Sequence, residues 1–203
     1  MLGNTLPILL LALPSPLLIA AMVAVRVTSP GPIFFRQRRI SRDGREFELL
    51  KFRSMRVLDD RAPEDADSGD SAAPLRAIGE DVGPGGLEAN HLRLTPIGGF
   101  IRRTSIDELP QLWNVLRSDM TLVGPRPERP EFVELFGQSI RRYDDRHRVK
   151  SGITGWAQVH GLRGQTSLAD RVEWDNYYIE NWSLWLDIKI LVMTIAAPFR
   201  PAE

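Results

Sequence analysis

A proline-broken apolar segment near the start of the chain constrains the fold more than any other feature. Residues 6–25 are apolar except at Pro7, Pro14, Ser15 and Pro16. A straight helix of this length would span about 30 Å, the thickness of a hydrocarbon core. The central prolines remove backbone hydrogen bonds and kink the helix, while the Ser15 hydroxyl can satisfy a freed carbonyl. We therefore expect a re-entrant membrane helix over residues 1–27, broken at Ser15 and Pro16, whose two halves return to one face.

Two other interpretations of this segment compete with the re-entrant helix. A spanning helix has the required length but lacks the required continuity. A cleaved signal peptide is disfavoured because residues 1–5 carry no positive charge and no small-residue cleavage site follows. In either membrane case, the arginine-rich residues 26–56 predict that residues 28–203 form a domain on the cytoplasmic face. The same arginines would hold that domain against anionic headgroups.

The amino-acid composition excludes several kinds of site and partner. The 203 residues suffice for one domain with a real core, and the formal net charge is zero. The chain has no cysteine, which excludes disulfides, thiol catalysis and cysteine-ligated zinc. Its three histidines, His91, His147 and His160, lack metal-ligand spacing. Zero net charge and the lack of a recognised binding motif argue against a nucleic-acid partner.

Alternating apolar residues predict a β-hairpin after the apolar segment. Residues 33–35 have the pattern of a short strand that ends in residues 36–39, and Asp43-Gly44 is a strong hairpin turn. Phe47 and Leu49 begin the alternation of a second strand that leads through Phe52. Residues 59–90 are acidic and poor in large apolar residues, so we expect a mobile loop there.

Two strings in this acidic loop superficially match known motifs. Asp65-Ala66-Asp67 has the DxD pattern of metal-dependent nucleotide-sugar enzymes, but no strand pattern precedes it. Gly83-Pro84-Gly85-Gly86 has no following Lys-Ser/Thr, so a P-loop is rejected.

Residues 102–127 hold the strongest candidate site. Ser105 and Glu108 have capping-box spacing, which would place Asp107 and Glu108 in the first turn of a helix. The free N–H groups and the helix dipole would there keep Asp107 ionised and attract phosphate oxygens. Attack on phosphorus requires such an ionised carboxylate, provided that a cation screens the repulsion. The alternative is that Glu108 only caps the helix, and Pro110 would move the helix start by a residue or two.

The rest of the chain predicts helices separated by a basic run and a glycine-rich loop. We expect helices over residues 131–143 and 168–178, and an apolar helix over residues 184–199 that is either interfacial or buried in the core. The basic run contains Arg141, Arg142, Arg146, Arg148 and Lys150, and alone it reads as a solvated face. Residues 151–161 predict a tight loop feeding a short strand, whose glycines permit close approach to a ligand.

Several short sequence motifs follow one another along nearly the whole chain. They are Ser15-Pro16, residues 29–37, residues 51–55, Arg102, residues 107–112 and 114–116, Asp119-Met120, residues 123–127, residues 152–159, and Asp175 with Tyr177-Tyr178. In this order and spacing they resemble the small monotopic phosphoglycosyl transferases, the bacterial sugar transferases that start glycan assembly on polyprenyl phosphate.

The resemblance implies a two-step transfer. Asp107 would attack the phosphate next to the sugar in a UDP-sugar, release UMP and carry a phosphosugar that polyprenyl (undecaprenyl) phosphate then removes, with ping-pong kinetics. It also implies Mg²⁺ at Asp107 and Glu108, with Glu108 a further candidate for proton handling. The candidate phosphate contacts are Lys51, Arg102, Arg126 and Arg148. Asp175 is carried over as an active-site carboxylate without an assigned role.

The sequence therefore predicts an α/β protein, mostly helical with a small sheet, at the cytoplasmic face of the bacterial inner membrane. Membrane phospholipid and later enzymes of polysaccharide assembly are its expected partners. Two other functions stay open. A non-catalytic membrane-surface scaffold would tolerate Asp107→Asn, whereas a conventional DxD glycosyltransferase would release UDP instead of UMP.

Overall fold

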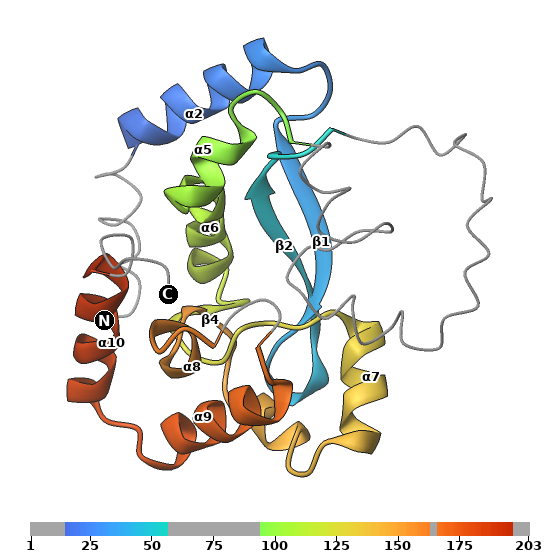
Figure 1. Ribbon diagram of the computed structural model, residues 1–203, viewed down its shortest axis with the longest axis vertical. Helices are drawn as coiled ribbons and strands as arrows, with labels where there is room; N and C mark the ends of the chain where they lie inside the picture. The colour runs from blue at the N-terminus through green and yellow to red at the C-terminus, as the bar shows by residue number, and fades with distance from the viewer. Residues whose placement is uncertain (1–14, 57–93, 163–165, 197–203) are drawn as a thin grey trace.

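The computed structural model describes residues 15–56, 94–162 and 166–196, and these residues form an α/β fold (Figure 1). Its helices are α2 (Ser15–Thr28), α5 (Gly98–Arg103), α6 (Gln111–Leu116), α7 (Pro130–Ser139), α8 (Trp156–Val159), α9 (Leu168–Glu180) and α10 (Leu184–Ala196). Short 3₁₀ turns are η1 (Arg42–Gly44), η2 (Ile106–Glu108) and η3 (Asp144–Arg148). The strands are β1 (Phe34–Ile40), β2 (Glu46–Phe52), β3 (Thr121–Val123) and β4 (Gly152–Thr154). Helices around small sheets confirm the predicted α/β class.

The predicted hairpin is present as the antiparallel pair β1–β2, which runs in Figure 1 from α2 at one end of the molecule to α7 at the other. Asp43 and Gly44 have φ of 57° and 74°, the left-handed geometry that a tight hairpin turn needs. β1 ends at Ile40, one residue beyond the expected residues 33–39. Its arginines belong to the strand because both sides of a two-stranded ribbon accept polar side chains, and Arg36 pairs with Glu48 at 3.3 Å.

An asparagine on α6 completes the edge of β2. Oδ1 of Asn114 accepts the Leu50 backbone N–H at 3.1 Å, and its Nδ2 donates to the Glu48 carbonyl at 2.8 Å. Asn114 is buried. One side chain therefore satisfies two backbone groups that a neighbouring strand would otherwise bind.

The second sheet is a short parallel pair, β3–β4. The backbones approach so closely that a Cβ on Gly152 would lie 2.2 Å from the backbone nitrogen of Gly124. The expected order within residues 151–161 is wrong: the strand comes first and the helical turn α8 follows it. The pairing of Gly152 with Thr121 fixes the strand at the start of the segment.

The described part of α2 runs from Ser15 to Thr28, and the residues on the other side of the predicted break lie outside the described ranges. Ala21 and Val25 are buried against Phe52 and Ile101, whereas the opposite face is apolar and exposed at Leu17, Ile19, Val23 and Val27. Within the described residues, no helix combines the length and the apolar character needed to cross a membrane.

Several sequence-based expectations concern residues outside the described ranges. They are the first half of the re-entrant helix, the acidic loop over residues 59–90 with its Asp65-Ala66-Asp67 string, His91, and the last residues of the helix expected over 184–199.

Three small apolar clusters make up the core of the described ranges. The first joins α2, β2 and α5 around Val25 and Phe52. The second packs α10 against β3 through Ile190 and Val123. The third lies between α7 and α9, around Phe136 and Val172. Helix α7 ends at Ser139, short of the expected residue 143, because Ile140 adopts an extended backbone with ψ of 122°.

Candidate active site

The two candidate carboxylates lie in a 3₁₀ turn of their own. Asp107 and Glu108 belong to η2, between α5 and α6. The predicted capping box is wrong, because Ser105 has a left-handed backbone with φ of 55° and its side chain makes no capping hydrogen bond. Helix α6 begins only at Gln111, after Pro110, which is suited to the helix start because it has no N–H to satisfy.

A lysine and an arginine from distant segments meet at Glu108. Its Oε1 accepts from Nη2 of Arg126 at 3.0 Å and lies 3.4 Å from Nζ of Lys51. Lys51 comes from β2, and Arg126 from the Pro-Arg-Pro turn after β3. Asp107 is the adjacent residue and is only 7% exposed. The structure thus brings together four of the predicted site residues, two carboxylates and two cations.

The other predicted residues lie in different surroundings. Arg102 is half-buried in the last turn of α5, where its carbonyl accepts the Ser105 backbone N–H at 3.2 Å. Arg148 is exposed, and its Nη2 lies 3.8 Å from Glu180. Asp175 is buried on α9 and accepts from Nη2 of Arg146 at 2.7 Å. No described contact joins Arg148 or Asp175 to Glu108.

Asp175 belongs to a buried ion cluster that the sequence did not reveal. The cluster, named here the arginine–carboxylate cluster, consists of Arg39, Glu128, Arg146, Arg171 and Asp175. Oε1 of Glu128 lies 3.7 Å from Nη1 of Arg146 and 3.4 Å from Nη1 of Arg171. Arg146 was expected on a solvated face, but its side chain is 0% exposed. That expectation is wrong because charge spacing alone does not show which arginine of a basic run turns inward.

This cluster holds the backbone of the Pro-Arg-Pro turn. Nη2 of Arg146 donates to the carbonyl of Arg126 at 3.1 Å, and Nη1 of Arg39 donates to the carbonyl of Pro127 at 3.0 Å. Because Arg126 is the residue that binds Glu108, the cluster fixes the backbone that carries a site residue. Asp175 is therefore linked to the backbone of Arg126 through Arg146.

Burial and charge shift the pKa values of groups around the cluster. Burial raises the pKa of Tyr143 to about 12. Burial, with the charge of Arg146, lowers the pKa of His147 to about 4. Burial alone would lower the pKa of Arg146, but Asp175, Tyr143 and Glu128 outweigh it and raise that pKa above its usual range. Arg146 thus keeps its charge in the interior.

The residues present suit a magnesium ion whose shell is completed by water and substrate. They do not suit a metal ion held by protein ligands alone. The described ranges contain no group of three or more His, Asp and Glu side chains that could hold a metal. Mg²⁺ usually takes one or two carboxylates and completes its shell with water and substrate phosphates. The adjacent Asp107 and Glu108 provide such a pair, and this is the chemistry of a site that handles phosphate.

The buried Asp107 and the half-buried Glu108, with Lys51 and Arg126, form a site in an α/β fold that suits an anionic phosphate substrate. The chain belongs to the bacterial sugar transferase family, whose model matches residues 2–201. The family membership predicted from the ordered motifs is thereby confirmed.

Individual relatives carry more specific names. The chain is 45% identical over 183 residues to a UDP-glucose:undecaprenyl-phosphate glucose-1-phosphate transferase of Xanthomonas campestris pv. campestris, covering 88% of this chain and 34% of the relative. It is 41% identical to a UDP-N-acetylgalactosamine-undecaprenyl-phosphate N-acetylgalactosaminephosphotransferase of Aeromonas hydrophila, covering 89% and 38%. An uncharacterized sugar transferase of Bacillus subtilis (strain 168) is 40% identical, with coverage of 94% and 82%. The chain thus spans little more than a third of the first two relatives.

Proposed function

We propose that this protein transfers sugar-1-phosphate from a UDP-sugar to undecaprenyl phosphate, a polyprenyl phosphate, and releases UMP. The observation that carries the proposal is the buried Asp107 beside Glu108, Lys51 and Arg126. The printed names of the relatives from Xanthomonas campestris and Aeromonas hydrophila support the same reaction class.

The proposed reaction proceeds in two displacements. A carboxylate oxygen of Asp107 forms a bond to the phosphorus next to the sugar, and the bond from that phosphorus to the oxygen of UMP breaks. An oxygen of polyprenyl phosphate then attacks the same phosphorus, which expels the Asp107 carboxylate and leaves a diphosphate-linked lipid. Lys51 and Arg126 bind the diphosphate oxygens, and Arg102 is a further candidate for this role. Mg²⁺ bound at Asp107 and Glu108 would supply charge that neutralises the diphosphate.

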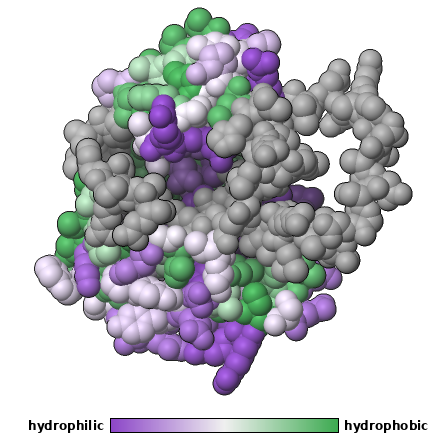
Figure 2. All heavy atoms as spheres, in the orientation of Figure 1, coloured by the Kyte–Doolittle hydropathy of each residue, from purple (hydrophilic) through white to green (hydrophobic). Residues whose placement is uncertain are grey.

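We propose further that the protein acts at the cytoplasmic face of the bacterial inner membrane. Apolar residues are exposed on α2 at Leu17, Ile19, Val23 and Val27, and Figure 2 shows apolar side chains gathered over this helix. The apolar helix α10 also exposes Trp185, Val192 and Ile195, and Trp182 precedes it. Tryptophan and aliphatic residues on a helix surface suit the headgroup boundary of a bilayer. A polyprenyl phosphate would meet the site at this boundary.

Nucleotide release tests the reaction directly. The full chain in detergent micelles would be supplied with Mg²⁺, undecaprenyl phosphate and a panel of UDP-sugars that includes UDP-glucose and UDP-N-acetylgalactosamine. We expect UMP from the wild type, none from Asp107→Asn, and wild-type release from Asp170→Asn, a matched change at an exposed residue of α9.

Other outcomes would select another function. Release of UDP would indicate a conventional glycosyltransferase. Unchanged UMP release by Asp107→Asn would refute the covalent role of this aspartate. Membrane recruitment of a partner without any nucleotide release, unchanged by the same variant, would indicate the scaffold.

A further inference from the structure

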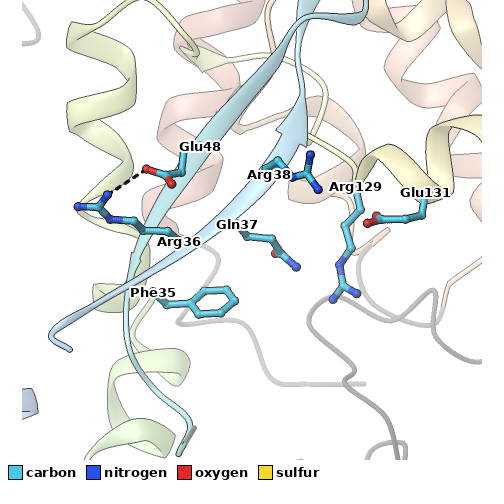
Figure 3. Close-up of a pocket in the computed structure, with 7 residues that line it drawn as sticks. All are labelled: Phe35, Arg36, Gln37, Arg38, Glu48, Arg129 and Glu131. Atoms are coloured by element: carbon cyan, nitrogen blue, oxygen red, sulfur yellow. Dashed lines mark hydrogen bonds and ion pairs between the residues drawn. The ribbon is translucent and has the colours of Figure 1, made fainter. Parts of the chain in front are cut away.

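A polar cavity of about 410 Å³ lies between β1 and the start of α7, and nothing above assigns it a ligand. Figure 3 shows Phe35, Gln37 and Arg129 directed into the same space, while Arg36 turns to the other side of the ribbon and pairs with Glu48. The volume is in the usual range for small-molecule sites, roughly 300–1,000 Å³. Phe35 is the only apolar residue among the seven that line it, so the cavity does not suit a polyprenyl chain.

Two residues that line the cavity, Phe35 and Arg129, are neighbours of proposed site residues. Phe35 is the cross-strand partner of Lys51, so both side chains project from the same face of the ribbon. Lys51 in turn lies 3.4 Å from Glu108. Arg129 follows Arg126 by three residues in the chain. A ligand whose phosphates are bound by Lys51 and Arg126 therefore has the cavity beside it.

Gln37 presents a hydrogen-bond donor in a fixed orientation. Its Oε1 accepts from Nη2 of Arg39 at 2.7 Å, and Arg39 is buried and held by its bond to the Pro127 carbonyl. The amide therefore has its oxygen toward Arg39 and its Nε2 away from it. Among the described residues, none accepts a hydrogen bond from this Nε2. A carbonyl oxygen of a ligand would complete it.

Phe35 and Arg129 complete the wall of the cavity. Phe35 is 46% exposed, so its ring is accessible to a ligand. Arg38 pairs with Glu46 at 3.6 Å, but no described carboxylate pairs with Arg129, whose guanidinium lies 5.4 Å from the Phe132 ring centre. An aromatic face, an amide donor and a positive charge match a planar base with carbonyl groups that is attached to phosphate.

We propose that this cavity is the uridine subsite, an inference that rests on the proposed use of a UDP-sugar. The uracil ring stacks on Phe35, a ring carbonyl accepts from Nε2 of Gln37, and Arg129 attracts the diphosphate. Gln37 then acts as a specificity residue, because Arg39 fixes which end of its amide meets the base.

Binding measurements separate the contribution of the base to affinity from that of the phosphate. Isothermal titration of the full chain in micelles would use UMP, ribose 5-phosphate and glucose 1-phosphate as probes. We expect Phe35→Leu and Gln37→Ala each to weaken UMP binding by about tenfold and to leave ribose 5-phosphate unchanged, because only UMP carries a base. Arg129→Gln should weaken the binding of both UMP and ribose 5-phosphate. Phe100→Leu, Gln138→Ala and Arg141→Gln are matched changes at exposed positions and should bind as wild type.

A second variant guards against a folding defect. Gln37→Glu keeps the acceptor for Arg39 and removes the donor, so its thermal unfolding should match the wild type while its UMP affinity falls. Unchanged UMP affinity in Phe35→Leu and Gln37→Glu would overturn the proposal. So would an equal loss for ribose 5-phosphate, or a loss confined to glucose 1-phosphate, which would indicate a sugar subsite.

The same experiment distinguishes this proposal from the proposed function. Unchanged UMP binding in the cavity variants, together with UMP release from a UDP-sugar, would refute the proposed subsite and support the proposed reaction. Weakened UMP binding in those variants, without Asp107-dependent release of UMP from a UDP-sugar, would support the proposed subsite and refute the proposed reaction. A wild type that binds no UMP would refute the subsite, and the nucleotide-release assay alone would then decide the reaction.

Discussion

Replacing Asp175 with asparagine should destabilise the fold by about 3 kcal/mol and lower activity, although Asp175 is linked to Arg126 only through Arg146 in the described contacts. Asp175 and Arg146 form an ion pair of 2.7 Å whose side chains are 3% and 0% exposed. Removal of one partner from such a buried pair costs roughly 3–5 kcal/mol because the other charge is left uncompensated. Glu128 remains 3.7 Å from Nη1 of Arg146, which favours the lower end of that range.

The corresponding shift in melting temperature is measurable. For a domain of this size, each kcal/mol lowers the melting temperature by about 2–4 °C, so Asp175→Asn should melt about 6–12 °C below the wild type. Circular dichroism during heating in micelles would detect it. Glu180→Gln removes a partner from the exposed pair Arg142–Glu180 and should leave the melting temperature unchanged.

A double variant separates stability from positioning. Arg146→Met with Asp175→Leu replaces the charges with apolar side chains and should recover most of the lost stability. UMP release should stay low with the KM for UDP-sugar raised, because the Arg126 carbonyl loses the N–H donor that orients this turn. Recovery of both stability and activity would refute the positioning role of Asp175, and a wild-type melting temperature for Asp175→Asn would refute the energetic argument.

Three further changes test other parts of the fold. Asn114→Leu should cost about 2–4 kcal/mol in urea unfolding, because the Leu50 N–H and the Glu48 carbonyl both lose their buried partner; equal stability would show that water replaces it. Gly152→Ala should cost about 1–3 kcal/mol since its Cβ would meet the Gly124 backbone nitrogen at 2.2 Å, whereas Gly99→Ala, with its nearest neighbour at 3.9 Å, serves as control. His147 has a folded pKa of about 4, below its unfolded value of 6.5, so the unfolded state binds more protons between these values and the free energy of unfolding should rise across that pH window, on the order of 3 kcal/mol. His147→Gln should flatten the pH dependence, and an unchanged slope would assign it to other groups.

The sequence predicted best the elements that are determined locally. Asp43-Gly44 specifies its hairpin because two successive residues with positive φ suit few other turns. Helix α9 was expected over residues 168–178 and ends at Glu180, since its pattern and its cap are both local. The same holds for α10, expected over residues 184–199, whose described part is Leu184–Ala196.

Long-range contacts account for what the sequence did not predict. Arg146 lies in a basic run like its neighbours, and only the fold gives it Asp175, 29 residues away. Likewise, Asn114 resembles an ordinary helix residue until β2 lies beside it. Ser105 and Glu108 have the spacing of a capping box, yet the left-handed backbone of Ser105 directs the chain into a separate turn. The residues around Glu108 could nevertheless be predicted together, because the family motifs include residues that lie far apart in the sequence.

The division of the core into three clusters has a consequence for how the protein loses activity. Lys51 is on β2, which packs in the first cluster, and Arg126 follows β3, which packs in the second. Arg146 links this turn to α9, which packs in the third. Each cluster is small, so local opening of any one costs less than global unfolding. The proposed transfer would require all three to be closed at once. Amide hydrogen exchange should therefore reveal partly open molecules well below the denaturant concentration at which the helices melt.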